Sequence, residues 1–379
     1  MTQTKPKRSA GRNLAYILVM LFILFLIVEI ILSIFFYHKL GSERLATIQG
    51  LKMAKQLVKG KPSSVNTQNQ QLVRPGASEE MNRKIAEETH LSNRFTYEPW
   101  IEFKNTDYKG EYVNVSGLLR KSSPAEFINP ASTDTIDIFF FGGSTTFGFN
   151  VADSETLPSQ VLQLYRQKYP QGKSVRVHNY GIPTYYSYQE LMLFTKLIFE
   201  GKRPDVVVFL DGVNDFWFAK ASYYNQSYFS YVMRQAFEGM GGGNFKFTDT
   251  ADRMFRDPEN IPLQQFNDTL VAHYMSNIRN AQQMANMVGA KAFFFCQPVP
   301  FYNYPNQQKD PICFKDTNTR YNYIYPAIEK NAASLPSFTF LGNMLQQESG
   351  YPFVDGLHYS PGFTKKLAEQ ILNVIGPAL

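Results

Sequence analysis

Cysteine is almost absent from this chain of 379 residues. Its two cysteines, Cys296 and Cys313, are too few for a disulfide framework and too far apart for a zinc knuckle. They can form one disulfide in an oxidising compartment or remain buried free thiols, and the sequence leaves both alternatives open. Internal repeats are also absent. A composition that is 44% hydrophobic and 18% charged excludes a disordered, a collagenous and a polytopic membrane protein.

The net charge of +6 is unevenly distributed. Residues 1–13 form a basic N-terminal tail that carries +4, and residues 38–76 carry a further +6. The remainder of the chain is therefore acidic, with a net charge of −4. Because the basic residues flank one apolar segment instead of lining a groove, the charge pattern disfavours nucleic acid as a partner.

That apolar segment predicts a transmembrane signal anchor at residues 14–37. Its 24 residues are interrupted only by Glu29 and Ser33, and as a helix they exceed the roughly 30 Å of a hydrocarbon core. No A-x-A-like cleavage site follows Tyr37, which disfavours a signal peptide. Basic residues are nearly balanced on the two sides, but an N-terminal anchor usually exports a long following domain. We therefore expect a single-pass membrane protein of a bacterial cell envelope, with its main domain outside the cytoplasm.

The rest of the chain predicts a linker followed by an α/β domain. Residues 38–94 are polar and form an expected stalk or linker, and residues 95–134 are a short, aromatic β-rich lead-in. From residue 135 onward, strands and helices alternate, which predicts a parallel sheet with helices on both faces. Residues 216–267 break this alternation and are expected to be an insertion or cap. The strands are expected at 135–141, 174–179, 205–210, 291–296 and 337–341, and the helices at 157–168, 188–199, 270–288 and from Ser360 to about Gly376.

The first strand ends in a turn that exposes a serine. Gly142, Gly143 and Ser144 follow residues 135–141 directly. Glycines allow a sharp turn, and a serine that enters the next helix can present its hydroxyl as a nucleophile. By itself such a serine is more often a helix cap or part of a phosphate-binding turn. The lysine of a P-loop is absent, so a nucleotide site is not indicated.

Three further signals lie at later strand ends and near the C-terminus. Gly181 follows the second strand, and Asn214 follows the third in a tight turn suited to aiming an N–H donor at an anion. Asp355 and His358 lie three residues apart on a loop, where a carboxylate can fix the tautomer of a general base. None of the other histidines has such a neighbour on a loop; they are His38, His90, His178 and His273.

Taken together and in order, these signals resemble the SGNH hydrolases, a branch of the GDSL lipase and esterase family. Gly142-Gly143-Ser144-Thr145 is similar to the first block, Gly181 to the second, Gly212-x-Asn214-Asp215 to the third and Asp355-x-x-His358 to the last. The resemblance covers residues 135–379 and implies a flavodoxin-like three-layer α/β/α fold with a parallel central sheet, preceded here by one transmembrane helix. One departure is Gly143 in place of the family's aspartate, which brings the chain closer to extracytoplasmic carbohydrate esterases and O-acetyltransferases.

The resemblance implies a site and a reaction. Ser144 would attack an ester carbonyl, His358 would take its proton, and Asp355 would orient the imidazole. The backbone N–H groups of Ser144 and Gly181, with the amide of Asn214, would form the oxyanion hole. The reaction requires no metal or other cofactor. The expected function is a membrane-anchored serine esterase that removes O-acyl, chiefly O-acetyl, groups from a carbohydrate.

Substrate contacts and the acceptor of the acyl group stay open. Aromatic side chains near the motifs, Tyr185, Tyr186 and Trp217, are candidates for stacking on a sugar ring, although most aromatics are core residues. The same site would serve an O-acyltransferase of an envelope polysaccharide, in which a sugar hydroxyl replaces water. A third alternative is a non-catalytic polysaccharide-binding or assembly module, against which the complete set of site residues argues. The sequence does not determine the oligomeric state.

Overall fold

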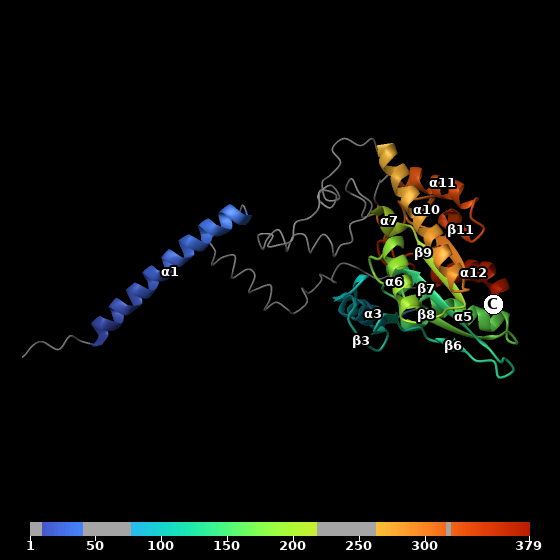
Figure 1. The fold of residues 1–379 in the computed structure, drawn as a ribbon, viewed down its shortest axis with the longest axis horizontal. Coiled ribbons are helices and arrows are strands. Elements are labelled where there is room, and N and C mark those ends of the chain that lie inside the picture. Colours follow the sequence, from blue (N-terminus) through green and yellow to red (C-terminus); the bar gives the residue numbers. More distant parts are fainter. Residues whose placement is uncertain (1–9, 41–76, 218–262, 316–319) are drawn as a thin grey trace, which may run out of the picture. The chain divides into compact units, whose positions relative to one another are not determined.

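The structure is a computed structural model that describes residues 10–40, 77–217, 263–315 and 320–379 (Figure 1). The chain divides into two compact units. One contains helix α1, and the other contains every other described element. The two units are described separately below.

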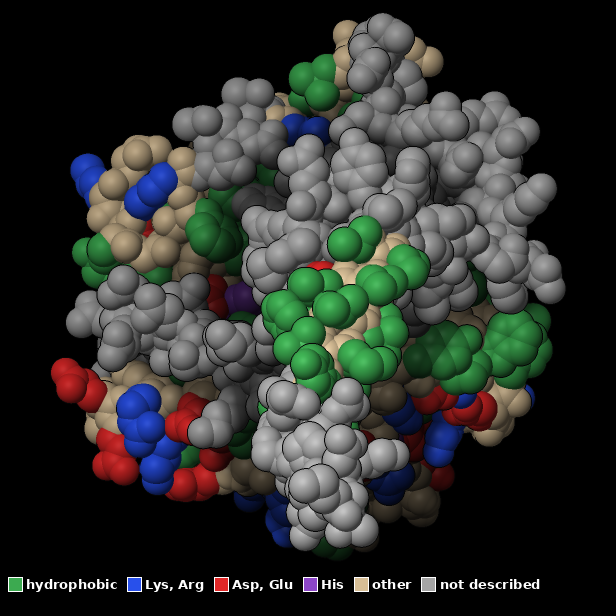
Figure 2. All heavy atoms as spheres, turned by 90° about the vertical axis from the view of Figure 1, so that its left-hand side faces the viewer, with side chains coloured by type: hydrophobic (Ala, Val, Ile, Leu, Met, Phe, Trp, Pro, Cys, Tyr) green, Lys and Arg blue, Asp and Glu red, His purple; other side chains and the backbone are tan. Residues whose placement is uncertain are grey.

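Helix α1 spans Ala10–Leu40 and contains the predicted anchor, residues 14–37. Its side chains are described from Tyr16 to Ile31, and all of them are exposed except that of Glu29. In the space-filling view of Figure 2 the exposed apolar side chains of this helix are green. No helix built from the described residues has both the length and the apolarity needed to cross a membrane.

The larger unit is built on a nine-stranded mixed sheet (Figure 1). Five parallel neighbours follow the order β11-β10-β9-β7-β8, which is the flavodoxin-like order 2-1-3-4-5 when they are renumbered along the chain. These strands are β7 (Thr135–Gly142), β8 (Ser174–Asn179), β9 (Val206–Asp211), β10 (Lys291–Cys296) and β11 (Phe338–Phe340). The predicted parallel strands are therefore confirmed to within about one residue at most ends.

The sheet is not parallel throughout, because the lead-in joins it. Strands β5 and β6 both pair antiparallel with β8, and β4 and β3 extend the sheet beyond β5. The prediction of a β-rich lead-in at residues 95–134 did not include this pairing, because strands of two or three residues carry no readable periodicity. The bounds are β1 (Phe95–Glu98), β2 (Glu102–Asn105), β3 (Tyr108–Lys109), β4 (Asn114–Ser116), β5 (Leu119–Arg120) and β6 (Glu126–Phe127), with β1 and β2 forming a two-stranded sheet of their own.

Helices cover both faces of the sheet and give the expected three layers. Along β7, Ile138 and Phe140 belong to one apolar core and Phe139 and Phe141 to the other, as the two-residue period of a strand requires. Helices α5 (Leu157–Lys168) and α12 (Pro361–Ile375) pack over the first core. The second core lies under α6 (Ser187–Phe199), α10 (Leu263–Met287) and α11 (Arg320–Ala332).

Two helices differ from the sequence prediction. Helix α11 was missed because Pro326 lies inside it and proline normally argues against a helix interior. Helix α3 (Glu79–Ser92) lies within the predicted stalk, yet Ile85 is fully buried and the carboxylate of Glu88 accepts the backbone N–H groups of residues 111–113. This part of the stalk thus belongs to the packed unit. Residues 41–76 of the stalk and 218–262 of the predicted insertion lie outside the described residues.

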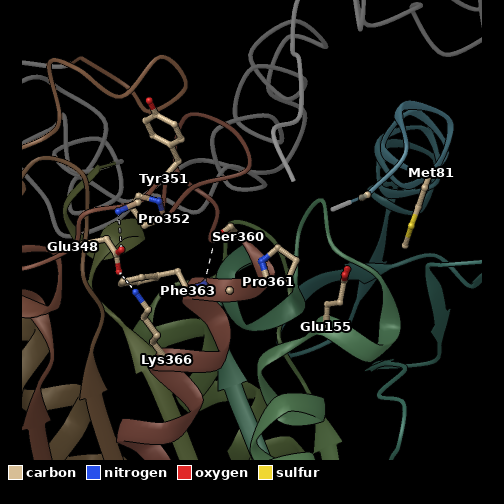
Figure 3. Close-up of a pocket in the computed structure, with 12 residues that line it drawn as sticks. Met81, Glu155, Glu348, Tyr351, Pro352, Ser360, Pro361, Phe363 and Lys366 are labelled. Atoms are coloured by element: carbon tan, nitrogen blue, oxygen red, sulfur yellow. Dashed lines mark hydrogen bonds and ion pairs between the residues drawn. The ribbon is translucent and has the colours of Figure 1, made fainter. Parts of the chain in front are cut away.

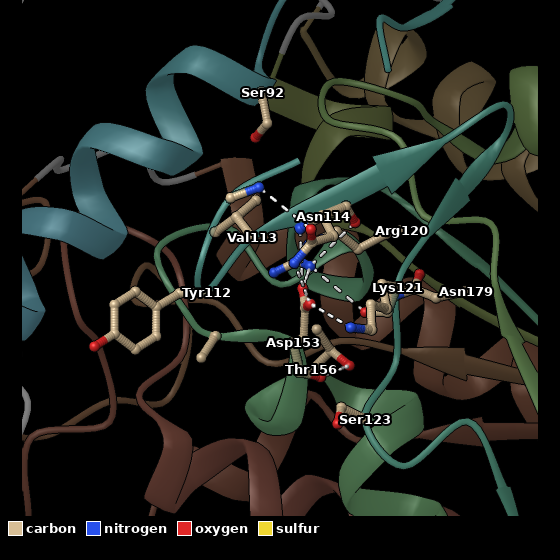
Figure 4. A network of polar contacts seen from close by, with 12 residues as sticks. Ser92, Tyr112, Val113, Asn114, Arg120, Lys121, Ser123, Asp153, Thr156 and Asn179 are labelled. Atoms are coloured by element: carbon tan, nitrogen blue, oxygen red, sulfur yellow. Dashed lines mark hydrogen bonds and ion pairs between the residues drawn. The ribbon is translucent and has the colours of Figure 1, made fainter. Parts of the chain in front are cut away.

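A buried ion pair joins strand β5 of the lead-in to the segment just before α5 (Figure 4). Arg120, 2% exposed, pairs with Asp153 and donates to the carbonyl of Val151 at 3.1 Å. Asn114 donates to the same carboxylate from its backbone and its side chain, at 3.1 and 2.7 Å. Burial lowers the pKa of Arg120 to about 9. The guanidinium also lies over the ring of Phe147, at 5.3 Å from its centroid, so the pair supports the helix that begins at the candidate nucleophile.

Candidate active site

Ser144 lies at the switch point of the sheet, where ligands bind in folds of this order. Strand β7 ends at Gly142, and Ser144 is the first residue of the short helix α4 (Ser144–Phe147). Gly143 makes this arrangement possible, because a Cβ atom there would lie 2.4 Å from the amide nitrogen of Asn214 and 2.9 Å from the carbonyl oxygen of Tyr185. The absence of a side chain at Gly143 thus lets the amide of Asn214 lie against the backbone just before Ser144.

His358 and Asp355 lie on a tight loop before α12. The loop is closed by a bridge between Phe353 and Tyr359 and by the backbone bond from the N–H of Val354 to the carbonyl of His358, 2.8 Å. His358 Nδ1 lies 2.9 and 2.8 Å from the two carboxylate oxygens of Asp355. Its Nε2 lies 2.8 Å from Ser144 Oγ. The structure therefore brings all three predicted residues into one continuous chain of hydrogen bonds.

The carboxylate of Asp355 determines which ring nitrogen of His358 carries the proton. Burial by itself would raise the pKa of Asp355, but the charge of His358 and hydrogen bonds from the ring and from the N–H groups of Leu357 and His358 outweigh it, so the pKa is lowered. An ionised carboxylate can only accept, so Nδ1 must donate to it. In the neutral ring Nε2 then has a free lone pair that accepts the hydroxyl proton of Ser144.

Two of the predicted oxyanion donors already have acceptors. The N–H of Gly181 donates to Oδ1 of Asn179 at 2.9 Å, so it has to leave that oxygen to serve an oxyanion. The amide of Asn214 donates to the carbonyl of Tyr185 at 2.6 Å and keeps a second hydrogen for another acceptor. The N–H of Ser144, at the start of a helix, has no acceptor within that helix. Close packing also requires a glycine at position 181, since a Cβ there would lie 2.3 Å from the nitrogen of Phe147.

The predicted sugar-stacking residues are not brought together at an open surface. Tyr185 is 1% exposed, and its hydroxyl donates to the carbonyls of Ile101 and Phe103, so no sugar can reach its ring and that prediction is corrected. Tyr186 is 7% exposed and stacks on Tyr188 at 6.3 Å. The side chain of Trp217 lies outside the described residues.

Three buried carboxyl groups lie behind Asn214, and only one of them, Asp215, was named from the sequence, as part of the third motif block. Asp211 ends β9, Asp215 lies in helix α7 (Val213–Trp217), and Glu190 lies in α6. Asp215 accepts the hydroxyl of Ser187 at 2.5 Å, and Asn277 donates to the same hydroxyl at 2.9 Å. Burial, with the neighbouring carboxyls, raises the pKa of Glu190 well above its usual value; burial raises that of Asp211 to about 6, and burial with Asp211 raises that of Asp215 to about 7. In the sequence, Glu190 is a single acidic residue in a largely apolar helix, and this local pattern does not indicate that it lies beside two aspartates.

The two cysteines are buried and form no disulfide, which decides between the two alternatives that the sequence left open. Among the described residues, no group of three or more histidine, cysteine, aspartate or glutamate side chains could hold a metal ion.

Comparisons with known proteins add the following. No model of a protein family matches the chain, and no curated protein matches it. Among solved structures, TesA is 17% identical and covers 64% of this chain and 99% of its own, with a TM-score of 0.37. A catalytic mutant of Axe2, an acetylxylan esterase from Geobacillus stearothermophilus, is 18% identical and covers 65% and 95%, with a TM-score of 0.38.

Proposed function

We propose that this chain is a serine esterase with Ser144 as its nucleophile. The observation that carries the proposal is the unbroken chain from Ser144 Oγ to His358 Nε2 at 2.8 Å and from Nδ1 to Asp355 at 2.8 Å. The serine is 9% exposed and lies at the carboxyl end of the parallel strands, where folds of this order bind their ligands. A serine used only as a helix cap would not require a histidine fixed in one tautomer.

In the first half of the reaction, the acyl group moves to the enzyme. Ser144 Oγ attacks the carbonyl carbon of the ester while its proton passes to His358 Nε2. The tetrahedral intermediate collapses, the bond to the alcohol oxygen breaks, and His358 returns the proton to the leaving alcohol. Asp355, held ionised by its hydrogen bonds, stabilises the imidazolium that forms between these steps.

In the second half, water or another hydroxyl removes the acyl group. Water gives up a proton to His358, attacks the acyl carbon and releases a carboxylic acid, after which the proton returns to Ser144 Oγ. In an O-acyltransferase a sugar hydroxyl takes the place of water and the product is a new ester. Both reactions use the same residues, so the acceptor is what separates them.

The oxyanion of the intermediate needs donors close to Ser144. We propose the N–H of Ser144 and the second amide hydrogen of Asn214 as the principal donors, with the N–H of Gly181 joining once it leaves Asn179. Support comes from Gly143, whose missing side chain leaves the amide of Asn214 against this turn. Loss of one such donor typically lowers kcat by about 10²–10³.

The substrate class and the location belong to the same proposal. We propose O-acetyl esters of a carbohydrate as the substrate, supported by the resemblance of the sequence motifs. We also propose that residues 14–37 anchor the chain in a membrane of a bacterial envelope, with the residues from 95 onward outside the cytoplasm. The support for an anchor is the run of 24 residues with a single charge and the exposed apolar side chains of residues 16–31.

The test of the nucleophile uses the full chain in mild detergent with p-nitrophenyl acetate and a fluorophosphonate probe. We expect ester hydrolysis and addition of one label per chain in the wild type, and neither in Ser144→Ala. Ser154→Ala is the matched control, because Ser154 is an exposed serine that is not part of the hydrogen-bond chain from Ser144 through His358 to Asp355. Hydrolysis that survives in Ser144→Ala contradicts the assignment, and a wild type that reacts with neither reagent favours a non-catalytic binding module.

The acceptor and the anchor need separate measurements. Mass spectrometry of acetylated and bare oligosaccharides after incubation distinguishes free acetate from a newly acetylated sugar. For the anchor, we expect the chain to stay with membranes through an alkaline wash and a variant without residues 1–40 to be released. Reporter fusions after residue 40 that are active only in the cytoplasm would show that the proposed orientation is reversed.

A further inference from the structure

Asn150 lies directly against the Asp355–His358 pair. It belongs to the loop between α4 and the short helix η2 (Asp153–Glu155) and is 5% exposed. Its side-chain amide donates to Oδ2 of Asp355 at 2.6 Å. Neither the sequence motifs nor the reaction described above assigns this residue a role.

The other hydrogen bonds to Asp355 come from its own loop. They are donated by the backbone N–H groups of Leu357 and His358 and by the His358 ring. Within the described parts of the chain, Asn150 is therefore the one donor to this carboxylate from outside residues 355–358. The bond connects the loop that carries the acid and the base to the segment that begins with the nucleophile, Ser144.

Phe149, the residue before Asn150, contacts the other member of the pair, His358. The ring of Phe149 stacks on the His358 imidazole with centroids 4.5 Å apart and planes at 27°. The N–H of Phe149 donates to the carbonyl of Ser144 at 3.0 Å, which fixes this turn to the start of α4. Two consecutive residues thus hold His358 and Asp355 against the element that carries Ser144.

The residue type at position 150 fits this task in two ways. Its φ of +62° is in the left-handed region, which asparagine and glycine adopt readily and most other residues do not. The amide is a neutral donor, so it stabilises the ionised form of Asp355 without adding charge. An aspartate would fit the same backbone but would place a second carboxyl group against the first.

We propose that Asn150 is a positioning residue of the candidate active site, which acts through Asp355 to hold His358 in the orientation that reaches Ser144. The inference rests on the proposed esterase function for its effect on rate. Its effect on His358 itself can be measured without any reaction.

The experiment compares two substitutions that keep the backbone conformation. Asn150→Gly removes the donor, and Asn150→Asp replaces it with a carboxyl group. Asn303→Gly and Asn303→Asp are the matched controls, because Asn303 also has a positive φ, +45°, but donates to Asn343, away from the site. All four variants are made in the full chain, and thermal unfolding is recorded for each.

For Asn150→Gly we expect kcat for p-nitrophenyl acetate to fall about 10- to 100-fold, while KM stays within about two-fold of the wild type. The reason is that the variant loses a hydrogen bond to a charged group and leaves the base misplaced. For Asn150→Gly and Asn150→Asp we also expect the deuterium exchange rate of the His358 ring C2 proton, compared at one pH, to differ at least about two-fold from the wild type, because Asp355 no longer holds the ring in one environment. That rate is read by mass spectrometry of the His358 peptide. Besides Asp355, the titratable side chains near the ring are Glu155 and Tyr359, which border the same small cavity.

The outcomes separate this inference from the proposed function. A kcat for Asn150→Gly within three-fold of the wild type, or an equal loss in Asn303→Gly, overturns the positioning role. So does a wild-type exchange rate at the His358 ring in both Asn150 variants. If the wild type shows no hydrolysis that depends on Ser144, the proposed function fails, and the exchange rate at His358 in the Asn150 and Asn303 variants still decides the role of Asn150.

Discussion

The buried carboxyl cluster behind Asn214 should make the stability of the protein depend on pH in an unusual direction. Asp215 has its pKa raised to about 7, whereas an unfolded chain leaves it near 3.8. Between about pH 4 and pH 7 the folded state therefore binds more protons at this site than the unfolded state does. Linkage then requires the free energy of unfolding to fall as pH rises through this window and to level off above it.

The size of the effect follows from the difference between the two pKa values. Each pH unit of difference corresponds to about 1.4 kcal/mol, so about three units give roughly 4 kcal/mol as an upper limit. Asp211 and Glu190 share the same buried space and take up part of the proton binding, which makes about 1–3 kcal/mol a reasonable expectation. Asp215→Asn removes the titratable proton, and its amide keeps an oxygen that accepts the hydroxyl of Ser187.

The assay is urea unfolding of the full chain at pH 5 and at pH 8. We expect the wild type to lose more stability between these pH values than Asp215→Asn does, by about 1–3 kcal/mol. Asp134→Asn is the control, because it removes a carboxylate that is exposed. An equal pH dependence in the wild type and Asp215→Asn would refute the reasoning that burial keeps this carboxyl group neutral.

Two further substitutions test the support of the site. Arg120→Met leaves the buried Asp153 carboxylate without its main partner, so we expect the free energy of unfolding in urea to fall by about 3–5 kcal/mol. Lys121→Met, at the edge of the same network, should lower it by less than about 1 kcal/mol. Gly143→Ala places a Cβ atom 2.4 Å from the amide of Asn214, so we expect kcat to fall about 10²-fold or more with a small change in KM. Gly362→Ala is the control for the glycine, since no atom lies within 4 Å of a Cβ there and its φ is not in the left-handed region. A Gly143→Ala enzyme with wild-type kcat would contradict the proposed role of this glycine in placing the amide of Asn214.

The regular elements of the large unit were largely predictable from the sequence. Strand β8 and helix α5 begin and end where the apolar pattern places them, because continuous apolar runs and helical periodicity are local properties of the chain. Helix α12 follows Ser360 and Pro361, whose capping roles are also local, and the hydroxyl of Ser360 accepts the N–H of Phe363 at 3.3 Å. Elements whose local pattern was weak, such as the two-residue strand β5, were not predictable.

The candidate site was partly predictable for a related reason. Ser144, Asp355 and His358 each lie where a strand ends or a helix begins, and parallel strands present those ends on one edge of the sheet. The sequence could therefore name them as partners before any distance was known. It could not tell that Tyr185 lies in the core, because an aromatic residue near a motif looks the same whether it faces a ligand or β2.

What the sequence determined by itself is the order of the five parallel strands and of most helices, and the choice of a serine, an aspartate and a histidine as candidates for the site. What only the tertiary structure decided is which residues support them. Asn150 meets Asp355 across 205 positions of the chain, and Arg120 meets Asp153 under the ring of Phe147. Such contacts depend on how the loops and the edge strands fold back on the sheet, and no local pattern of residues records where a distant side chain will lie.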